Sequence, residues 1–315
     1  MTPARVARAD AVILAGATCT GKTALALRLA EHYPVEIISV DSAQVYRGMD
    51  IGTSKPSRAL LDAVPHHLID LCDPSDAYSA GRFRRDATAA IAAVRARGRV
   101  PLLVGGTMLY FRALTRGIAP LPEADPALRS RIDLHAQQFG WPVLHAELAL
   151  NDPAAAARIR PTDGQRIQRA LEVLELTGQP LSTLQRQIEP APFAFASFAL
   201  MPEDRSELYA RIDARFVQMM EQGFLDEVRS LRARGDLHAD LPSLRSVGYR
   251  QLWSHLAGDL SLEAAIAGGQ RATRNLAKRQ LTWIRSETAF AGIKGLEDQA
   301  LAPIKGAITA VMGRG

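Results

Sequence analysis

The stretch Gly16–Thr23 constrains the fold of this chain more than any other. Its sequence, Gly-Ala-Thr-Cys-Thr-Gly-Lys-Thr, matches the pattern G-x-x-x-x-G-K-[ST] of a phosphate-binding loop. The apolar run Ala11–Ala15 before it is typical of a buried strand, and Ala24–Ala30 after it has a helical pattern. Because this strand–loop–helix order is the context that such a loop requires, we predict a nucleotide-binding P-loop of the kind found in ATP-binding proteins.

The P-loop is expected to hold a diphosphate or a triphosphate, and its sequence does not distinguish the two. Its two glycines are expected to allow backbone angles that a side chain would forbid, so that successive N–H groups point into one concavity at a helix N-terminus. Lys22 is expected to reach the outer phosphates, and the Thr23 hydroxyl to hold Mg²⁺. The predicted phosphate-binding residues are Gly16, Ala17, Thr18, Cys19, Thr20, Gly21, Lys22 and Thr23.

Composition leaves room for a polyanionic partner without requiring one. The chain has 315 residues, with 38 basic against 33 acidic side chains and a formal charge of +5. Only two cysteines occur, which implies no disulfide framework. The first residues, Met1–Arg8, lack the apolar core of a signal peptide, and no apolar run is long enough to cross a membrane. We therefore expect a cytoplasmic protein with no membrane partner.

Polar residues follow two further predicted strands at the points where the strands end. Asp41 comes directly after Val35–Val40, and the turn Gly105-Gly106-Thr107 comes after Val100–Val104. The carboxyl ends of parallel strands form the edge where ligands bind. Asp41 is therefore a metal-holding acid, a general base or simply a helix N-cap. The Gly-Gly-Thr turn either frames the same cleft or only starts a helix.

The pattern changes near residue 119, where Pro120, Pro122 and Pro126 precede a series of helical stretches. The next clear strand, Phe193–Leu200, arrives about 75 residues later. A crossover between neighbouring strands needs about a dozen residues. We therefore predict an α/β fold with a P-loop core of mostly parallel sheet flanked by helices, at 1–118 and 196–315. An all-helical domain is predicted to be inserted at 119–195.

Basic residues form a stripe on a helix predicted around Gly269–Arg285. At 100° per residue, four cations span roughly 60° of the helical wheel: Arg271, Arg274, Lys278 and Arg285. No acidic residue occurs from Gln270 through Arg285. The stripe is either a footprint for a nucleic-acid backbone or a solvated face.

Arg211 and Arg215 lie one helical turn apart in an earlier predicted helix. Two guanidinium groups on one face either clamp a phosphate together or point into solvent. The sequence leaves both interpretations open.

These segments together resemble one family, the tRNA dimethylallyltransferases, also called isopentenyl-diphosphate:tRNA transferases. The similarity runs in order from about residue 11 to about residue 286. It rests on Gly16–Thr23, Ile38–Tyr46, Gly48–Thr53, Pro65–Asp70, Leu102–Tyr110, Ala170–Val173, Ser246–Gln251 and Ala277–Trp283. Only the P-loop is shared widely with other families, and the remaining segments are specific as a set.

The resemblance implies transfer of a dimethylallyl group from dimethylallyl diphosphate to N6 of adenosine 37, next to the tRNA anticodon, giving N6-(dimethylallyl)adenosine. It implies Mg²⁺ as cofactor and a monomer that binds the anticodon stem-loop. Asp41 becomes the general base, Thr107 positions the amine from the opposite wall, and Arg215 lies near the diphosphate. The target base is expected to leave its stack, as enzymes that modify bases generally require.

The resemblance also assigns tRNA contacts, including several on the inserted helices. They are Asp41, Ser42, Ala43, Gln44, Thr107, Arg129, Gln165, Arg166, Ile167, Gln168, Arg169, Arg245, Ser246, Val247, Gly248, Tyr249, Arg250, Lys278, Arg279, Gln280, Leu281, Thr282, Trp283, Ile284 and Arg285. Two alternatives from other classes share the P-loop core: a small-molecule or nucleotide kinase, and a non-catalytic RNA-binding switch regulated by nucleotide.

Overall fold

The computed structural model describes residues 8–295 and 298–313, so the predicted lack of a signal peptide in Met1–Arg8 falls almost entirely outside the described residues. The chain divides into two compact units. The core unit comprises Met1–Thr115 and Pro192–Gly315, and the insertion unit comprises Arg116–Ala191. Each unit is described by itself below.

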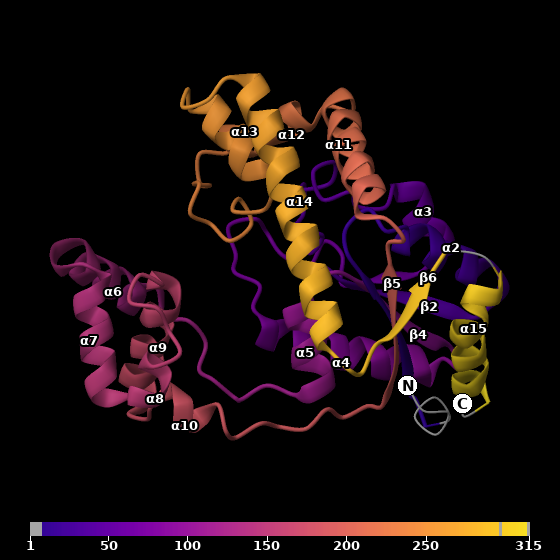
Figure 1. The fold of residues 1–315 in the computed structure, drawn as a ribbon, viewed down its shortest axis with the longest axis horizontal. Coiled ribbons are helices and arrows are strands. Elements are labelled where there is room, and N and C mark those ends of the chain that lie inside the picture. Colours follow the sequence, from indigo (N-terminus) through magenta and orange to yellow (C-terminus); the bar gives the residue numbers. More distant parts are fainter. Residues whose placement is uncertain (1–7, 296–297, 314–315) are drawn as a thin grey trace. The chain divides into compact units, whose positions relative to one another are not determined.

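A six-stranded sheet forms the centre of the core unit (Figure 1). Its strands are β1 (Ala11–Gly16), β2 (Val35–Val40), β3 (His66–His67), β4 (Val100–Gly105), β5 (Phe195–Met201) and β6 (Ala291–Lys294). Every neighbouring pair is parallel, in the order β3-β2-β4-β1-β5-β6. The predicted α/β class with a parallel sheet is confirmed, and the two short outer strands β3 and β6 were not expected.

Helices cover both faces of this sheet, because alternate residues of each strand point to opposite sides. Val12 and Leu14 of β1 pack with α2 (Lys22–His32) and with α15 (Asp298–Met312). Ile13, between them, belongs to the other face. That face is covered by α4 (Ala80–Ala96) and α5 (Met108–Arg116). Burial on both faces explains why the central strands read as continuous apolar runs.

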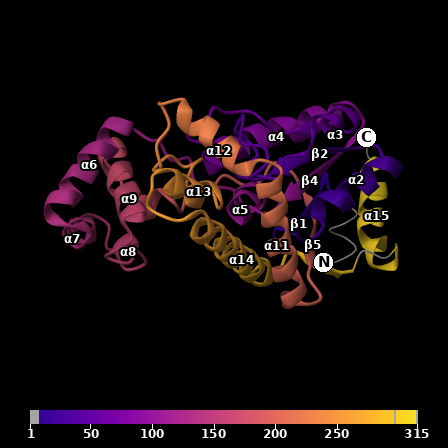
Figure 2. The same ribbon diagram turned by 90° about the horizontal axis from the view of Figure 1, so that it is seen from above.

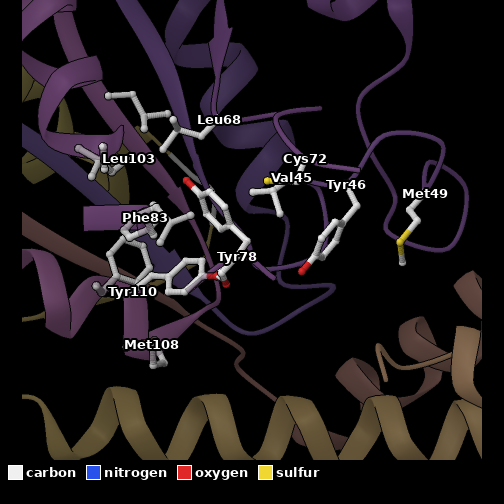
Figure 3. Packing of buried hydrophobic residues seen from close by; sticks show 14 of the residues in the cluster. Val45, Tyr46, Met49, Leu68, Cys72, Tyr78, Phe83, Leu103, Met108 and Tyr110 are labelled. Carbon is white, nitrogen blue, oxygen red and sulfur yellow. Dashed lines mark hydrogen bonds between the residues drawn. The ribbon is translucent and has the colours of Figure 1, made fainter. Parts of the chain in front are cut away.

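Figure 3 shows part of the packing on the α4 and α5 side of the sheet. The rings of Phe83 and Tyr110 are stacked with their centroids 4.3 Å apart. The Tyr110 hydroxyl donates a hydrogen bond to the carbonyl of Tyr78, at 3.1 Å. Ser79 caps α4 by accepting a hydrogen bond from the N–H of Arg82, which explains why a helix begins directly after this serine.

Four helices follow β5 and pack on one another, as both ribbon views show (Figures 1 and 2). They are α11 (Arg205–Glu221), α12 (Phe224–Ala233), α13 (Tyr249–Leu256) and α14 (Leu262–Ser286). One further short helix, α3 (Arg58–Ala63), follows β2 in the chain. The helix α14 begins earlier than the predicted Gly269, because Ser261 caps it by accepting from the N–H of Ala264.

The described insertion unit is built from helices. They are α6 (Pro126–Phe139), α7 (Trp141–Asn151), α8 (Pro153–Ala156), α9 (Gly164–Thr177) and α10 (Leu181–Leu184). Its apolar side chains form two small clusters, in which Leu144, Leu148 and Ile167 are fully buried.

Glu172, at the centre of the insertion unit, is a fully buried carboxylate. It accepts hydrogen bonds from Arg129 (2.8 and 3.0 Å), from Arg169 (2.6 Å) and from the N–H of Asp125 (2.9 Å). Burial alone would raise the pKa of Glu172, but these hydrogen bonds outweigh it and lower the pKa. The two arginines therefore hold the insertion unit together, because removing either would leave a buried charge incompletely paired.

Candidate active site

The loop after β1 has the geometry of a phosphate cradle. Gly21 has φ 92°, and Cys19, the only other loop residue in the left-handed region, has φ 61°. The prediction for Gly16 needs correction, because its φ is not positive and its constraint is space instead. A Cβ there would lie 2.8 Å from the Thr20 hydroxyl and 3.0 Å from the carbonyl oxygen of Leu200. The first N–H groups of α2 follow directly, without intrahelical partners.

Lys22 folds back over this loop. Its Nζ donates a hydrogen bond to the carbonyl oxygen of Ala17 at 2.6 Å, and the Thr20 hydroxyl donates to the same oxygen at 2.8 Å. Burial lowers the pKa of Lys22 to about 8, whereas the nearby carboxylate of Asp41 acts in the opposite direction. The charge of Arg215 lowers the pKa further. An ammonium with this little solvation is ready to gain from a phosphate ligand.

Asp41 lies at the end of β2, at the same edge of the sheet as the phosphate loop. Its Oδ1 accepts from the N–H groups of Ala43 (2.8 Å) and Gln44 (3.3 Å). Residues 41–44 form a turn and no helix, so the N-cap alternative is wrong and the carboxylate organises a turn instead. Within the described residues, Oδ2 accepts no hydrogen bond from the protein.

Thr107 comes from the turn after β4, the strand that lies between β1 and β2. Its hydroxyl oxygen accepts from the N–H of Ser42 at 3.1 Å, so it lies beside the Asp41 turn. The sheet therefore brings together the two predicted catalytic residues, which are 66 positions apart in the chain.

Gln280 of α14 connects two of these loops. Its Oε1 accepts from the N–H of Thr18 at 3.0 Å, and its Nε2 donates to the carbonyl of Gly106 at 2.9 Å. The sequence predicted that Gln280 contacts tRNA. In the structure, its side chain instead links the phosphate loop to the turn after β4. Gln44 is likewise engaged, through hydrogen bonds with Ser39 and with the carbonyls of Thr53 and Ser54.

Two adjoining cavities lie at this edge of the sheet, both within the core unit. The inner cavity, of about 350 Å³, is lined by the phosphate loop, including Lys22 and Thr23. The outer cavity, of about 550 Å³, is lined by Thr107, Arg245 and Trp283 among others. The walls common to both are Thr18, Cys19, Asp41, Thr53, Ser54, Gly106, Arg215 and Gln280. Asp41 thus borders both the cavity that contains the phosphate loop and the larger cavity beside it.

Arg215 of α11 borders both cavities. Its Nε donates a hydrogen bond to the Ser54 hydroxyl at 2.8 Å. Arg211, one turn earlier, borders neither of them but lines an adjoining cavity of about 750 Å³ together with Arg215. The two arginines therefore line one common cavity, as the clamp alternative requires, and only Arg215 also borders the inner and outer cavities.

Several residues of the expected tRNA-contacting segments belong to the hydrophobic core. Ile167, Tyr249, Leu281 and Ile284 have side chains at most 5% exposed. Tyr249 nevertheless lines the outer cavity, whereas the other three side chains present no surface for RNA. The basic stripe on α14 is also smaller than expected. Arg274 forms an ion pair with Asp213 of α11, whereas Arg271, Lys278 and Arg285 are exposed.

The expected contact residues in the insertion unit divide in the same way. Arg129 and Arg169 hold Glu172, and Gln168 donates to Asp133 at 2.7 Å. Gln165 and Arg166 are exposed on α9. The remaining expected contacts are in the core unit, where Arg245, Arg250, Arg279 and Thr282 are exposed and Ser246 and Val247 are half-buried.

Sequence reasoning missed the part played by the segment from Asp50 to Lys55. Ser54 borders both cavities and holds Arg215. This segment overlaps Gly48–Thr53, which resembles the family, so the resemblance was the available signal in the sequence. The apolar wall of the outer cavity, with Ile212, Phe216 and Met219 of α11, was also not expected.

A metal ion at this site would have to rely on few protein ligands. Among residues 8–295 and 298–313, no three His, Cys, Asp or Glu side chains form a group that could hold a metal ion. Mg²⁺ is usually bound by one or two protein oxygens together with substrate phosphates and water. The Thr23 hydroxyl on the inner cavity fits that pattern. Within the part of the chain that the structure describes, no helix has the length and apolarity to span a bilayer.

Comparison with protein families gives two matches. Residues 44–287 match the family described as IPP transferase, and residues 9–72 match the family described as isopentenyl transferase. A tRNA dimethylallyltransferase of Alkalilimnicola ehrlichii is 61% identical over 277 residues, covering 88% of this chain and 87% of the relative. A tRNA dimethylallyltransferase of Bordetella parapertussis is 53% identical over 306 residues, covering 96% of both chains.

Solved structures give a consistent result. A tRNA isopentenylpyrophosphate transferase from Bacillus halodurans superimposes with a TM-score of 0.68 at 37% identity, covering 96% of each chain. A eukaryotic dimethylallyltransferase, described as acting on tRNA, superimposes with a TM-score of 0.74 at 26% identity. That alignment covers 90% of this chain and 73% of the eukaryotic chain.

Proposed function

Because the chain belongs to the tRNA dimethylallyltransferase family and is an enzyme that prenylates tRNA, we propose that it moves the dimethylallyl group of dimethylallyl diphosphate to N6 of adenosine 37. The product is N6-(dimethylallyl)adenosine, in the anticodon loop. The observation that carries this proposal is the position of Asp41 between the inner and the outer cavity. The similarities do not favour a kinase.

The reaction uses the two cavities for its two reactants. The diphosphate lies in the inner cavity, and the target adenine, extruded from its stack, lies in the outer cavity. The bond between C1 of the dimethylallyl group and the diphosphate oxygen breaks, and a bond from N6 to C1 forms. The proton lost by N6 goes to the Asp41 carboxylate, while the Thr107 hydroxyl holds the amine in line. Because the adenine amine is a poor nucleophile, positioning contributes more than base strength.

Charge that develops on the leaving diphosphate is met by groups already in place. The N–H groups of the phosphate loop, the Lys22 ammonium and the Arg215 guanidinium all border the inner cavity. Prenyltransferases generally use a divalent metal ion, and we propose Mg²⁺ held through the Thr23 hydroxyl and the substrate phosphates. When bound, the ion supplies further neutralisation of the leaving group.

The outer cavity offers an apolar surface for the dimethylallyl group. Ile212 and Phe216 of α11 are nearly buried, and Met219 and Leu276 also contribute to the wall. An apolar wall beside the reacting carbon excludes water, which would otherwise compete with the amine as nucleophile.

We propose that the exposed cations of the core unit bind the tRNA backbone. Arg245 and Arg279 border the outer cavity, and Lys278 and Arg285 follow the exposed side of α14. The exposed Gln165 and Arg166 of the insertion unit extend this role to the anticodon stem-loop. The proposal includes a cytoplasmic enzyme that acts as a monomer, which light scattering of the purified protein checks.

The direct test is a product assay. Purified protein incubated with dimethylallyl diphosphate, Mg²⁺ and unmodified tRNA is expected to yield N6-(dimethylallyl)adenosine, detected by mass spectrometry of the digested tRNA. A transcript with guanosine at position 37 is the control and should remain unmodified. If no prenylated nucleoside forms, and a parallel reaction supplied with ATP consumes it, the kinase alternative is supported instead.

Removing Lys278 tests the proposed RNA surface. If its ammonium contacts a phosphate, Lys278→Ala is expected to flatten the slope of log affinity against log salt by roughly 0.7 to 0.9. Lys294, an exposed lysine on β6, provides a matched control, and Lys294→Ala should leave the slope unchanged. The measurement is tRNA binding at several salt concentrations. Equal slopes for wild type and Lys278→Ala would make this side of α14 an ordinary solvated surface.

A further inference from the structure

One carboxylate outside the reaction site is fully occupied by hydrogen bonds from a single loop and a tyrosine. Glu227 of α12 accepts from the N–H groups of Asp50 (2.9 Å) and Ile51 (2.7 Å) through Oε2. Its Oε1 accepts from the N–H of Gly52 (3.2 Å) and from the Tyr249 hydroxyl (2.6 Å). A carboxylate has about four acceptor positions, so all of them are used.

The loop held in this way lies against α12 and has an unusual backbone. A Cβ on Gly52 would lie 2.1 Å from the Phe224 ring, so only glycine permits this approach. Ser54 has φ 52°, a left-handed conformation that costs a serine free energy unless its surroundings impose it. The N–H of Ser54 donates to the carbonyl of Ile51 at 3.0 Å, within the part that Glu227 holds.

The far end of the same loop reaches the reaction site. The Ser54 hydroxyl accepts the hydrogen bond from Arg215 Nε, and Ser54 borders both cavities. The connection therefore runs from the Glu227 carboxylate through three consecutive N–H groups to Ser54, and from Ser54 to the guanidinium of Arg215. Within the described residues, the two terminal nitrogens of Arg215 donate no hydrogen bond to the protein, so they are available to donate to a phosphate.

We propose that Glu227 is a positioning residue for the diphosphate: it fixes the Asp50–Ser54 loop, and the loop fixes Arg215. The inference rests on the proposed function, because it assigns Arg215 to the diphosphate. Glu227 itself borders none of the cavities described above and does not touch the substrate. Its link to the inner cavity runs through Ser54 and Arg215, whereas its other contact with the site is the Tyr249 hydroxyl at the outer cavity. We therefore expect its removal to weaken diphosphate binding more than tRNA binding.

An amide in place of the carboxylate tests this connection with little change in size. In Glu227→Gln, the amide NH2 faces N–H donors of the loop, and the charge that strengthens these hydrogen bonds is lost. We expect the KM for dimethylallyl diphosphate and the Kd for Mg²⁺-diphosphate each to rise about 10-fold. The kcat at saturation and the Kd for tRNA should remain within about threefold of wild type. Asp226→Asn is the matched control, because Asp226 is the neighbouring, exposed acid that pairs with Arg229.

A second variant tests whether Glu227 acts on Arg215 through Ser54. Ser54→Ala removes only the hydroxyl that holds Arg215, and it should raise the diphosphate Kd about 3- to 10-fold. Combined with Glu227→Gln it should add little, because both changes act through the same guanidinium. Multiplying effects in the double variant, or a tRNA Kd that rises as much as the diphosphate Kd, would contradict the proposal.

The remaining outcomes are also decisive. A Glu227→Gln enzyme with the KM of Asp226→Asn overturns the proposal. If Glu227→Gln does not fold, Ser54→Ala decides alone, and a wild-type diphosphate Kd in that variant overturns it. A wild-type enzyme that forms no prenylated tRNA would refute the proposed function, whereas diphosphate binding by the variants would still test the role of Glu227.

Discussion

Replacing Asp41 with asparagine is expected to lower kcat for prenyl transfer by about 10²-fold or more. The asparagine Oδ1 can still accept from the N–H groups of Ala43 and Gln44, so the turn after β2 is kept while the base is lost. The tRNA Kd should therefore stay near the wild-type value. Asp41→Ala is a less specific change, because it also removes the two hydrogen bonds of the turn.

Single-turnover rates with preformed enzyme–tRNA complex provide the measurement, since they report chemistry without product release. Asp62→Asn is a suitable control, because Asp62 is an exposed acid that pairs with Arg58 on α3. If Asp41→Asn and Asp62→Asn react at the same rate, the carboxylate at position 41 is not the base.

Lys22→Met is expected to reduce kcat/KM for dimethylallyl diphosphate by about 10²- to 10³-fold, because the leaving group loses its preorganised ammonium. The Kd for Mg²⁺-diphosphate should rise as well, while the tRNA Kd should not change. Lys22→Arg keeps the charge and should retain more activity than Lys22→Met. Equal losses in both variants would indicate that shape, and not charge, is what position 22 supplies.

The same residue gives the wild-type enzyme a specific pH dependence. With the pKa of Lys22 lowered to about 8, the ammonium loses its proton as the pH rises through that value, and diphosphate binding should weaken. Substrate ionisation affects wild type and Lys22→Arg equally, so comparing the two at each pH removes its contribution. The diphosphate Kd of wild type divided by that of Lys22→Arg should therefore increase as the pH is raised beyond 8. In the unfolded chain the lysine keeps its proton to about 10.5. Its contribution to the free energy of unfolding therefore increases with pH between these two values.

Local patterns in the sequence were sufficient to predict much of this architecture. The strand Ala11–Gly16, the phosphate loop and the helix after Ser79 each have a nearby signal, such as a run of apolar residues or a cap. The strands β3 and β6 have two and four residues, too few for a periodic pattern. The helix α15 follows the last segment that resembled a family and contains Pro303, which is unusual inside a helix.

The site was predictable where its residues end neighbouring strands, as Asp41 and Thr107 do. The site was not predictable where a charged side chain could pair either with RNA or with another residue of the protein. Arg129 and Arg169 have the residue type and the setting of RNA-binding arginines, yet both hold the buried Glu172. The partner of an arginine depends on tertiary packing, which no short segment encodes.

The hydrogen bonds of Gln280 bear on how this protein is made. The phosphate loop precedes α14 in the chain, so the side chain that ties the loop to Gly106 is synthesised much later than the loop itself. Thr18 and Gln280 are 262 positions apart, and such long-range contacts form only after most of the chain is available. A nascent chain that stops before α14 would contain the complete P-loop motif but would lack the hydrogen bonds that join Gln280 to Thr18 and Gly106. Completion of the cradle is thus deferred until α14 has been synthesised.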